Sequence, residues 1–366
     1  MDIPWVRFVS QSGVYLTFAL CLAWAARRGA RDWAPLVSAC LYAVLFEHWN
    51  MMRYAQVQGG YHYNTASWVW VWGDVPLYIP LAWAFILATS RALTDRLRLP
   101  PWARPFSDAL LALLIDASMD AVAIRLGFWY WHGVRLNEGF FGVPADNFVG
   151  WLLVSFTFSA LTRWLWSDRP GGNGAAISST NDTAGDFTFN VADPGSASPP
   201  ESGGRGSKAL GALPEFAGSL TASKNRAIGK AAAQIIVLPP IAYLAYLGLE
   251  AIVHLQYRLF HAETLRGQLF VLAGTIFLFA AVVIAGLSRS DKDRGADGGN
   301  VVSKRPGNAL VHGPRQLFHL FGPIGLLFVP AALRAPALWA LAGGVWALEW
   351  SIALFAAKVS RRTKGI

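Results

Sequence analysis

The stretch GQLFVLAGTIFLFAAVVIAGL occupies residues 267–287 and contains no charged residue, although Arg266 and Arg289 flank it. A helix of about 20 apolar residues crosses the hydrocarbon core of a bilayer. The composition of the whole chain agrees with this, because 54% of its 366 residues are hydrophobic and 14% are charged. Soluble domains carry about 25% charged residues. The sequence therefore predicts an integral membrane protein whose surroundings are a lipid bilayer.

Eight further apolar runs on either side of this stretch are long enough to cross a membrane as helices. Basic residues gather at alternate ends of the runs, such as Arg27 and Arg28 after the first and Arg361 and Arg362 after the last. Lys and Arg concentrate in cytoplasmic loops, so we predict an all-α polytopic transmembrane bundle of about nine helices. Its N-terminus would lie outside and its C-terminus in the cytoplasm, in the bacterial inner membrane. The nine runs are residues 6–26, 33–51, 68–90, 105–126, 147–166, 230–254, 267–287, 315–332 and 336–357.

Two polar stretches divide the apolar runs. Residues 168–226 are rich in Gly, Ser, Ala, Pro, Asn and Asp, and such a composition buries too little apolar surface to offset the entropy of ordering. We expect a disordered cytoplasmic linker there, and a shorter linker of the same kind at residues 288–314. The prediction is a five-helix half at residues 1–167, which carries the candidate site, and a four-helix half at residues 227–366.

The charge and the cysteines exclude several classes of function. The net charge of +9 comes from basic residues beside apolar runs rather than in one patch, so no nucleic-acid partner is predicted. Cys21 and Cys40 both lie inside apolar runs, which excludes a disulfide framework and a Cys-rich zinc site. The seven His residues lack the close spacing of metal ligands. We expect no metal and no cofactor.

Carboxylic acids inside the apolar runs of the first half are the main candidates for chemistry. Glu47 ends the second run, Asp74 lies just before Pro76 in the third, and Asp116 and Asp120 share one face of the fourth. A buried ionisable group in a membrane is costly and is therefore a functional candidate. Structural alternatives remain open: Asp116 and Asp120 could join helices, Glu47 could be hydrated at the interface, and Asp74 could satisfy backbone groups that the proline frees.

Aromatic residues fill the two loops that follow the second and fourth runs, both predicted to lie outside. Tyr61 and Tyr63 stand in the first loop, and Trp129 and Trp131 in the second. They could belong to an interfacial aromatic belt. Because the acids lie toward the same outer side, we expect one cavity that opens outward. The four-helix half offers only scattered Glu250, His254, His319 and Glu349, and we expect it to serve packing.

In order and spacing, these pieces resemble the membrane carotenoid-biosynthesis proteins that include the carotenoid 1',2'-hydratases and bisanhydrobacterioruberin hydratase. The resemblance covers about residues 40–165 and, more faintly, 239–247. Asp146 and the two linkers depart from the family pattern, which bears on the substrate more than on the fold. The matching pieces are the acidic end of the second run with residues 60–63, Val75-Pro76 before residues 79–83, Asp116 and Asp120 followed by Trp129 and Trp131, and residues 141–144 with Asn147 and Gly150-Trp151.

The resemblance implies acid-catalysed hydration of a terminal isoprenoid double bond, with a lipophilic carotenoid or isoprenoid as substrate. Such a hydratase, a carbon–oxygen lyase, needs an acid that protonates carbon, aromatic faces that stabilise the tertiary cation and an ordered water. No redox cofactor is needed. We expect Asp116 or Asp120 to be the acid, with its partner or Glu47 positioning water. The further candidates are Asp74 as an acid, Tyr61, Tyr63, Trp129 and Trp131 around the cation, and Asn147 and Trp151 for substrate binding.

Two other functions fit parts of the same pattern. The spacing of Asp116 and Asp120 occurs in intramembrane prenyltransferases that bind Mg²⁺-diphosphate, but a second such motif is missing and the predicted outer position conflicts with a cytoplasmic diphosphate. A transporter for lipids or small molecules would suit the Gly- and Pro-interrupted run at residues 73–80. The two halves, however, show no matching interrupted helices.

Overall fold

The computed structural model describes residues 4–54, 59–64, 69–72, 75–167, 225–259, 265–296, 315–316, 319, 321, 324–329 and 335–361. The described chain is mostly helical. Two small two-stranded sheets lie in the connections between helices. The helices are α1 (Pro4–Arg28), α2 (Ala30–Tyr54), α3 (Tyr78–Thr94), α4 (Arg104–Ala123), α5 (Ala145–Leu165), the π-helical turn η1 (Ala233–Val237), α7 (Leu238–Leu259), α8 (Leu265–Ala296) and α10 (Pro336–Arg361). The strands are β1 (Tyr61–Tyr63), β2 (Trp70–Val71), β3 (Val75–Pro76) and β4 (Trp129–Trp131).

Within the described residues, five helices are long and apolar enough to cross a membrane. They are α1, α5, the continuous helix at Asn225–Leu259 that contains η1 and α7, α8 and α10. Their number and apolarity indicate a helical membrane protein. The nine-span topology stays a prediction, because much of the run at 315–332 lies outside the described residues.

Three of the four remaining predicted spans lie largely within the described residues, and they differ from the apolar helices. The runs at 33–51 and 105–126 form α2 and α4, which contain buried acids. The run at 68–90 was predicted to be one helix, and this was wrong. Its first part makes the β2–β3 ribbon, in which Trp72 has a positive φ of 56°, and the helix starts only at Tyr78. Pro80 then stands in the first turn of α3, where a missing N–H leaves no helical hydrogen bond unmade.

The linker predictions are mostly untested. The predicted linker at 168–226 lies outside the described residues except for its last two. The second one, at 288–314, begins later than predicted, because α8 continues to Ala296. Opposite charges stand three or four residues apart in residues 289–294, a spacing that favours a helix. Residues 297–314 are outside the described part.

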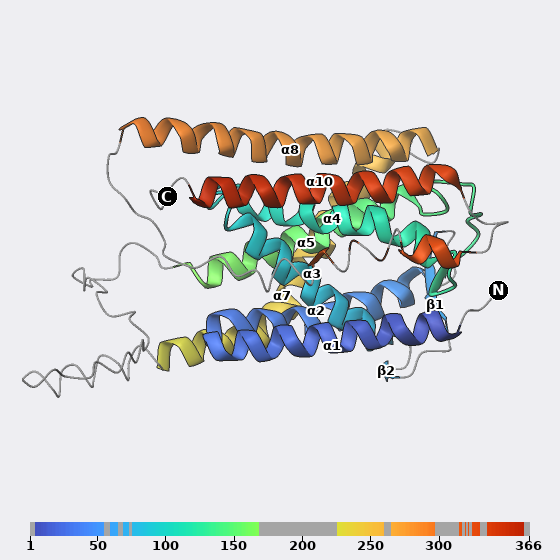
Figure 1. Cartoon of the computed structure of the whole chain (residues 1–366), viewed down its shortest axis with the longest axis horizontal. Coiled ribbons are helices and arrows are strands. Elements are labelled where there is room, and N and C mark those ends of the chain that lie inside the picture. Colours follow the sequence, from blue (N-terminus) through green and yellow to red (C-terminus); the bar gives the residue numbers. More distant parts are fainter. Residues whose placement is uncertain are drawn as a thin grey trace, which may run out of the picture. The chain divides into compact units, whose positions relative to one another are not determined.

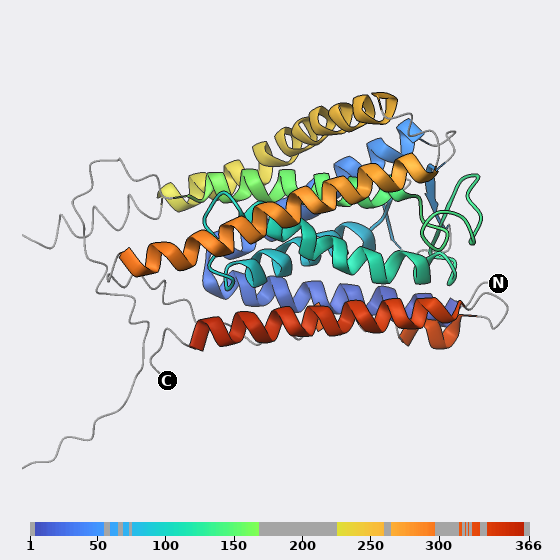
Figure 2. The same ribbon diagram turned by 90° about the horizontal axis from the view of Figure 1, so that it is seen from above.

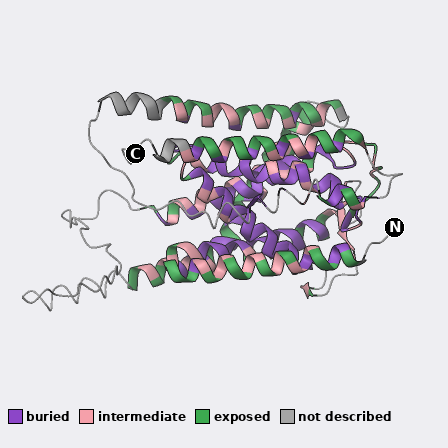
Figure 3. Ribbon diagram, viewed as in Figure 1, coloured by how far each residue is buried: buried purple, intermediate pink, exposed green. Residues whose placement is uncertain are grey.

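The buried core joins both halves of the chain into one compact unit, residues 1–166 and 228–366. Buried residues concentrate on α2, α3, α4 and α5, whereas α1, α8 and α10 expose much of their surface (Figure 3). The helices lie side by side in both views of the ribbon (Figure 1 and Figure 2). Large apolar side chains on the outer helices are exposed, such as Phe277 on α8 and Leu244 on α7. Such surfaces are typical of helices that face lipid.

Candidate active site

Glu47 receives three hydrogen bonds at the end of α2 that is nearest the small sheets. Tyr61 Oη donates to Glu47 Oε2, and Tyr63 Oη donates to the same oxygen over 2.7 Å. Trp83 Nε1 on α3 donates to Glu47 Oε1 over 2.7 Å. The side chain is 4% exposed. A buried polar group with partners on both oxygens is held in one orientation.

The two tyrosines reach Glu47 because β1 and β4 form an antiparallel pair. Tyr61 lies opposite Trp131 and Tyr63 opposite Trp129. Alternate residues of a strand point to one face, so these four aromatic rings share the face that is turned toward α2. Both loops were predicted as loops only. The alternation in Tyr61-His-Tyr63 and Trp129-Tyr-Trp131 was the signal for a strand pair.

The phenols of Tyr61 and Tyr63 stay protonated at this position. Burial, followed by the neighbouring Glu47 carboxyl, raises the pKa of both side chains well above the usual value of about 10. Each hydroxyl therefore keeps its proton over the pH range in which proteins work. Tyr61 and Tyr63 therefore donate hydrogen bonds to Glu47.

A second pair of acids lies on α4. Asn147 Nδ2, in the first turn of α5, donates to Asp116 Oδ2 over 3.1 Å and to Asp120 Oδ2 over 2.8 Å. Both carboxyl groups are buried. Asp116 Oδ1 has no hydrogen-bond partner within the described part of the chain. Two acids thus meet around one amide nitrogen, as their spacing of four residues on a helix permits.

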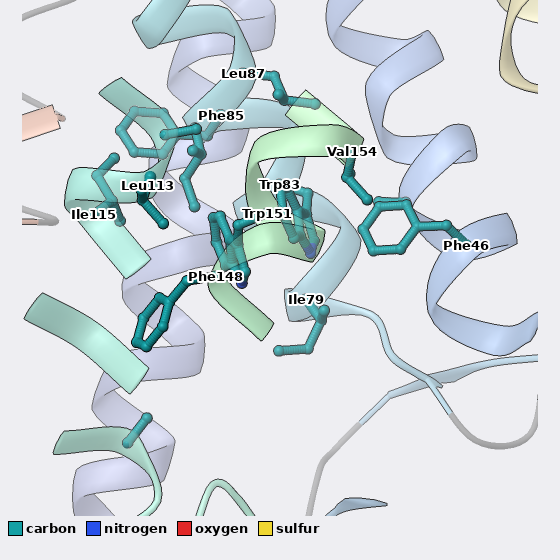
Figure 4. Close-up of a cluster of buried hydrophobic side chains, with 14 of the residues drawn as sticks. Phe46, Ile79, Trp83, Phe85, Leu87, Leu113, Ile115, Phe148, Trp151 and Val154 are labelled. Atoms are coloured by element: carbon teal, nitrogen blue, oxygen red, sulfur yellow. The ribbon is translucent and has the colours of Figure 1, made fainter. Parts of the chain in front are cut away.

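A cavity of about 270 Å³ lies between Glu47 and the aspartate pair on α4. Glu47, Asp120 and Asn147 all line it, whereas Asp116 does not. Much of the wall is aromatic. Trp83 and Trp151 stack with ring centroids 3.9 Å apart, and Figure 4 shows the two indoles together with Phe46 and Val154 nearby. Further aromatic lining residues are Tyr54, Tyr61, Tyr63, Trp129, Trp131, Tyr246 and Tyr257.

Most of the predicted site residues come together here. Asp74 lies outside the described residues, and Asp116 stands beside the cavity as the partner of Asp120. The others share one cavity wall. They are Glu47, Asp120, Tyr61, Tyr63, Trp129, Trp131, Asn147 and Trp151. Their catalytic and binding roles remain predictions.

Two parts of the wall were not predicted. Trp83 belongs to residues 79–83, one of the pieces that resemble the family, but no functional role was predicted for it. The four-helix half was expected to look more like packing than chemistry, yet α7 lines the cavity with Tyr246, Glu250, His254 and Tyr257. Their spacings of four, four and three residues place them on one helix face. That periodicity was visible in the sequence.

Residues 11–190 match the model of the carotenoid biosynthesis protein family. This match agrees with the resemblance drawn from the motifs of the five-helix half. The match includes α2 to α5 and hence most of the cavity, whereas α7 lies beyond it. A match to a carotenoid biosynthesis family favours a lipophilic isoprenoid substrate. Neither the curated proteins nor the solved structures gave a match to the chain.

Proposed function

We propose that this protein hydrates a terminal carbon–carbon double bond of an acyclic carotenoid or a related isoprenoid, by acid catalysis inside the membrane. The observation that carries the proposal is the Asp116–Asp120 pair beside a cavity with an aromatic wall. The apolar part of the wall suits a hydrocarbon end group. The acids are the polar groups that an addition of water requires.

The proton comes from the aspartate pair. Two carboxylates that share one amide nitrogen repel each other if both are ionised. No cationic side chain is paired with either of them within the described residues. A single proton held between the two removes that repulsion. Asp120 is the acid because it lines the cavity, and Asp116 is its partner.

The carbocation is stabilised by the aromatic wall. Protonation of the terminal double bond at its less substituted carbon leaves the positive charge on the tertiary carbon. Indole faces attract cations, and Trp83, Trp129, Trp131 and Trp151 all line the cavity. Glu47, fixed by its three donors, adds a carboxyl group from the opposite helix.

Water completes the addition. Its oxygen bonds to the tertiary carbon, and the proton it loses returns to the aspartate pair. The pair is then ready for another turnover, and the product has gained one water with no change in redox state. Glu47 positions this water by accepting a hydrogen bond from it. The carboxyl oxygens use the lone pairs that are not occupied by Tyr61, Tyr63 and Trp83.

Expression in a lycopene-producing host tests the proposal. Pigments are extracted and analysed by mass spectrometry. We expect a product heavier by one water, formed equally well with and without a chelator, and no such product from Asp120→Asn. A product that carries a prenyl group and disappears with chelator would instead identify a Mg²⁺-dependent transferase. Unchanged pigments, with transport of the substrate into proteoliposomes, would identify a transporter.

A further inference from the structure

Glu250 on α7 is the centre of a second polar cluster at the cavity. Tyr54 Oη and Tyr246 Oη donate to Glu250 Oε1 over 2.9 Å and 3.0 Å. Arg53 Nη1 donates to Glu250 Oε2 over 2.8 Å. Asn50 Nδ2 donates to Tyr246 Oη over 3.2 Å. We call these five residues, Asn50, Arg53, Tyr54, Tyr246 and Glu250, the α2–α7 cluster.

This cluster runs from the protein surface to the cavity without a break in its hydrogen bonds. The Arg53 side chain is 41% exposed and that of Glu250 13%, whereas Tyr246 and Asn50 are buried. Asn50, Tyr54, Tyr246 and Glu250 all line the cavity. The neighbouring surface of α7 is apolar, with Ile252 and Leu255 exposed. The cluster is therefore a polar route beside a lipid-facing surface.

Two buried polar atoms in the cavity lining lack partners in the described part of the chain. Asn50 Oδ1 and Trp131 Nε1 make no hydrogen bond within the described part of the chain. Both residues line the same cavity. One atom accepts and the other donates, so a water molecule suits each of them. Buried polar groups without a protein partner are usually bound to ordered water.

The proposed reaction needs water inside the cavity. The hydrocarbon core of a bilayer supplies no water to groups that face it, yet each turnover under the proposed function consumes one water. We propose that the α2–α7 cluster is the route by which water reaches the cavity, and that Glu250 is a positioning residue that holds the route open. Glu250 orients Tyr54 and Tyr246, Arg53 connects it to bulk water, and Asn50 receives the water inside. This inference rests on the proposed function for the use of the water, but not for its presence.

Hydroxyl-radical footprinting of the purified protein in nanodiscs tests the presence of water without any substrate. Radicals formed from bound water label nearby aromatic rings, and mass spectrometry locates the label. We expect labelling in the wild type of Tyr246, although it is buried, and of Trp131, which is partly buried. Glu250→Leu should remove most of the labelling of both residues. Glu138→Gln, which changes an exposed acid in the loop after β4, is the matched control and should leave labelling unchanged.

Turnover gives an independent measurement. Glu250→Leu should lower kcat about ten- to hundredfold and leave KM for the isoprenoid unchanged, because the aromatic wall stays intact. Glu250→Gln keeps the shape of the side chain and should lose less, and Tyr246→Phe should resemble it. If Glu250→Leu does not fold, Glu250→Gln and Tyr246→Phe still test the proposal.

The outcomes separate the two proposals. If labelling falls in Glu250→Leu but the wild type forms no hydrated product, the route stands and the hydratase proposal falls. If the wild type hydrates its substrate while Tyr246 and Trp131 are unlabelled, the route is wrong and the hydratase proposal stands. Labelling and kcat that are both unchanged in all three variants would also overturn the route.

Discussion

The indoles of Trp83 and Trp151 stack with their centroids 3.9 Å apart and so join α3 to α5 at the wall of the cavity. Trp83 also donates from Nε1 to Glu47 on α2 over 2.7 Å. One side chain thus connects three helices and orients a carboxyl group. Residues that hold a carboxyl in this way decide whether it can place a water molecule.

Replacement of Trp83 tests this role. Trp83→Phe keeps an aromatic ring against Trp151 but removes the donor to Glu47. We expect kcat to fall about tenfold or more, because hydrogen bonds to charged groups contribute about 1.5–3 kcal/mol. The measurement is product formation with purified protein, beside the melting temperature in detergent. Trp164→Phe, at a side chain that is 61% exposed on α5, is the control; equal activity in both variants would contradict the role.

The aspartate pair is expected to be essential. Asp120→Asn and Asp116→Asn each remove a proton-carrying group and should lower turnover by about 10²–10⁴-fold, the usual contribution of general acid catalysis. Pigment profiling and gel filtration in detergent measure activity and folding together. Asp32→Asn, in the ion pair with Arg28 at the other end of α2, should stay fully active. Hydration by both site variants at the wild-type rate would remove the pair from the mechanism.

The tyrosines on β1 are expected to act as donors at every accessible pH. Tyr61→Phe and Tyr63→Phe should each lower kcat, while Tyr130→Phe, on the exposed face of β4, should not. Because burial and Glu47 raise the pKa of both phenols above about 10, the hydroxyls remain protonated below that pH. An alkaline loss of activity below pH 10 would therefore come from other groups. The midpoint of this alkaline loss should be the same in the double variant Tyr61→Phe, Tyr63→Phe as in the wild type. A shift of the midpoint would show that one of the two phenols titrates in this range.

A buried ion pair in the four-helix half is expected to stabilise the folded protein. Arg315 Nε donates to Glu349 Oε1, and both side chains are fully buried. Arg315 also donates to Ser90 Oγ over 2.9 Å and to the carbonyl of Leu111 over 2.6 Å. Glu349→Ala leaves the guanidinium without its counter-charge and should cost about 3–5 kcal/mol.

Thermal unfolding in detergent measures this effect. Ser351→Ala, at an exposed position on α10, should unfold at the wild-type temperature. The double variant Arg315→Met, Glu349→Leu removes both charges and should recover part of the loss, because a well-packed apolar pair often replaces a buried ion pair. A Glu349→Ala protein as stable as the wild type would show that the pair contributes nothing.

Local patterns in the sequence were sufficient for several features of the fold. Apolar runs of membrane-spanning length predicted α5, α8 and α10. The spacing of Asp116 and Asp120 predicted that they share a helix face, and the order of short motifs predicted the family. These features depend on neighbours within one helix or on residue order, so the chain encodes them locally.

Packing between distant segments decided the rest. β1 and β4 pair across the whole of α3 and α4, and only that pairing turns Tyr61 and Tyr63 toward Glu47. Glu250 meets Arg53 across 197 residues, which brings α7 to a cavity otherwise built by the front half. The helical periodicity of a sequence shows which residues share one face of a helix. It does not show which neighbouring helix that face will contact. That choice is made by the complementarity of all the helices together, and here it places the acids, the aromatic wall and the polar route around one cavity.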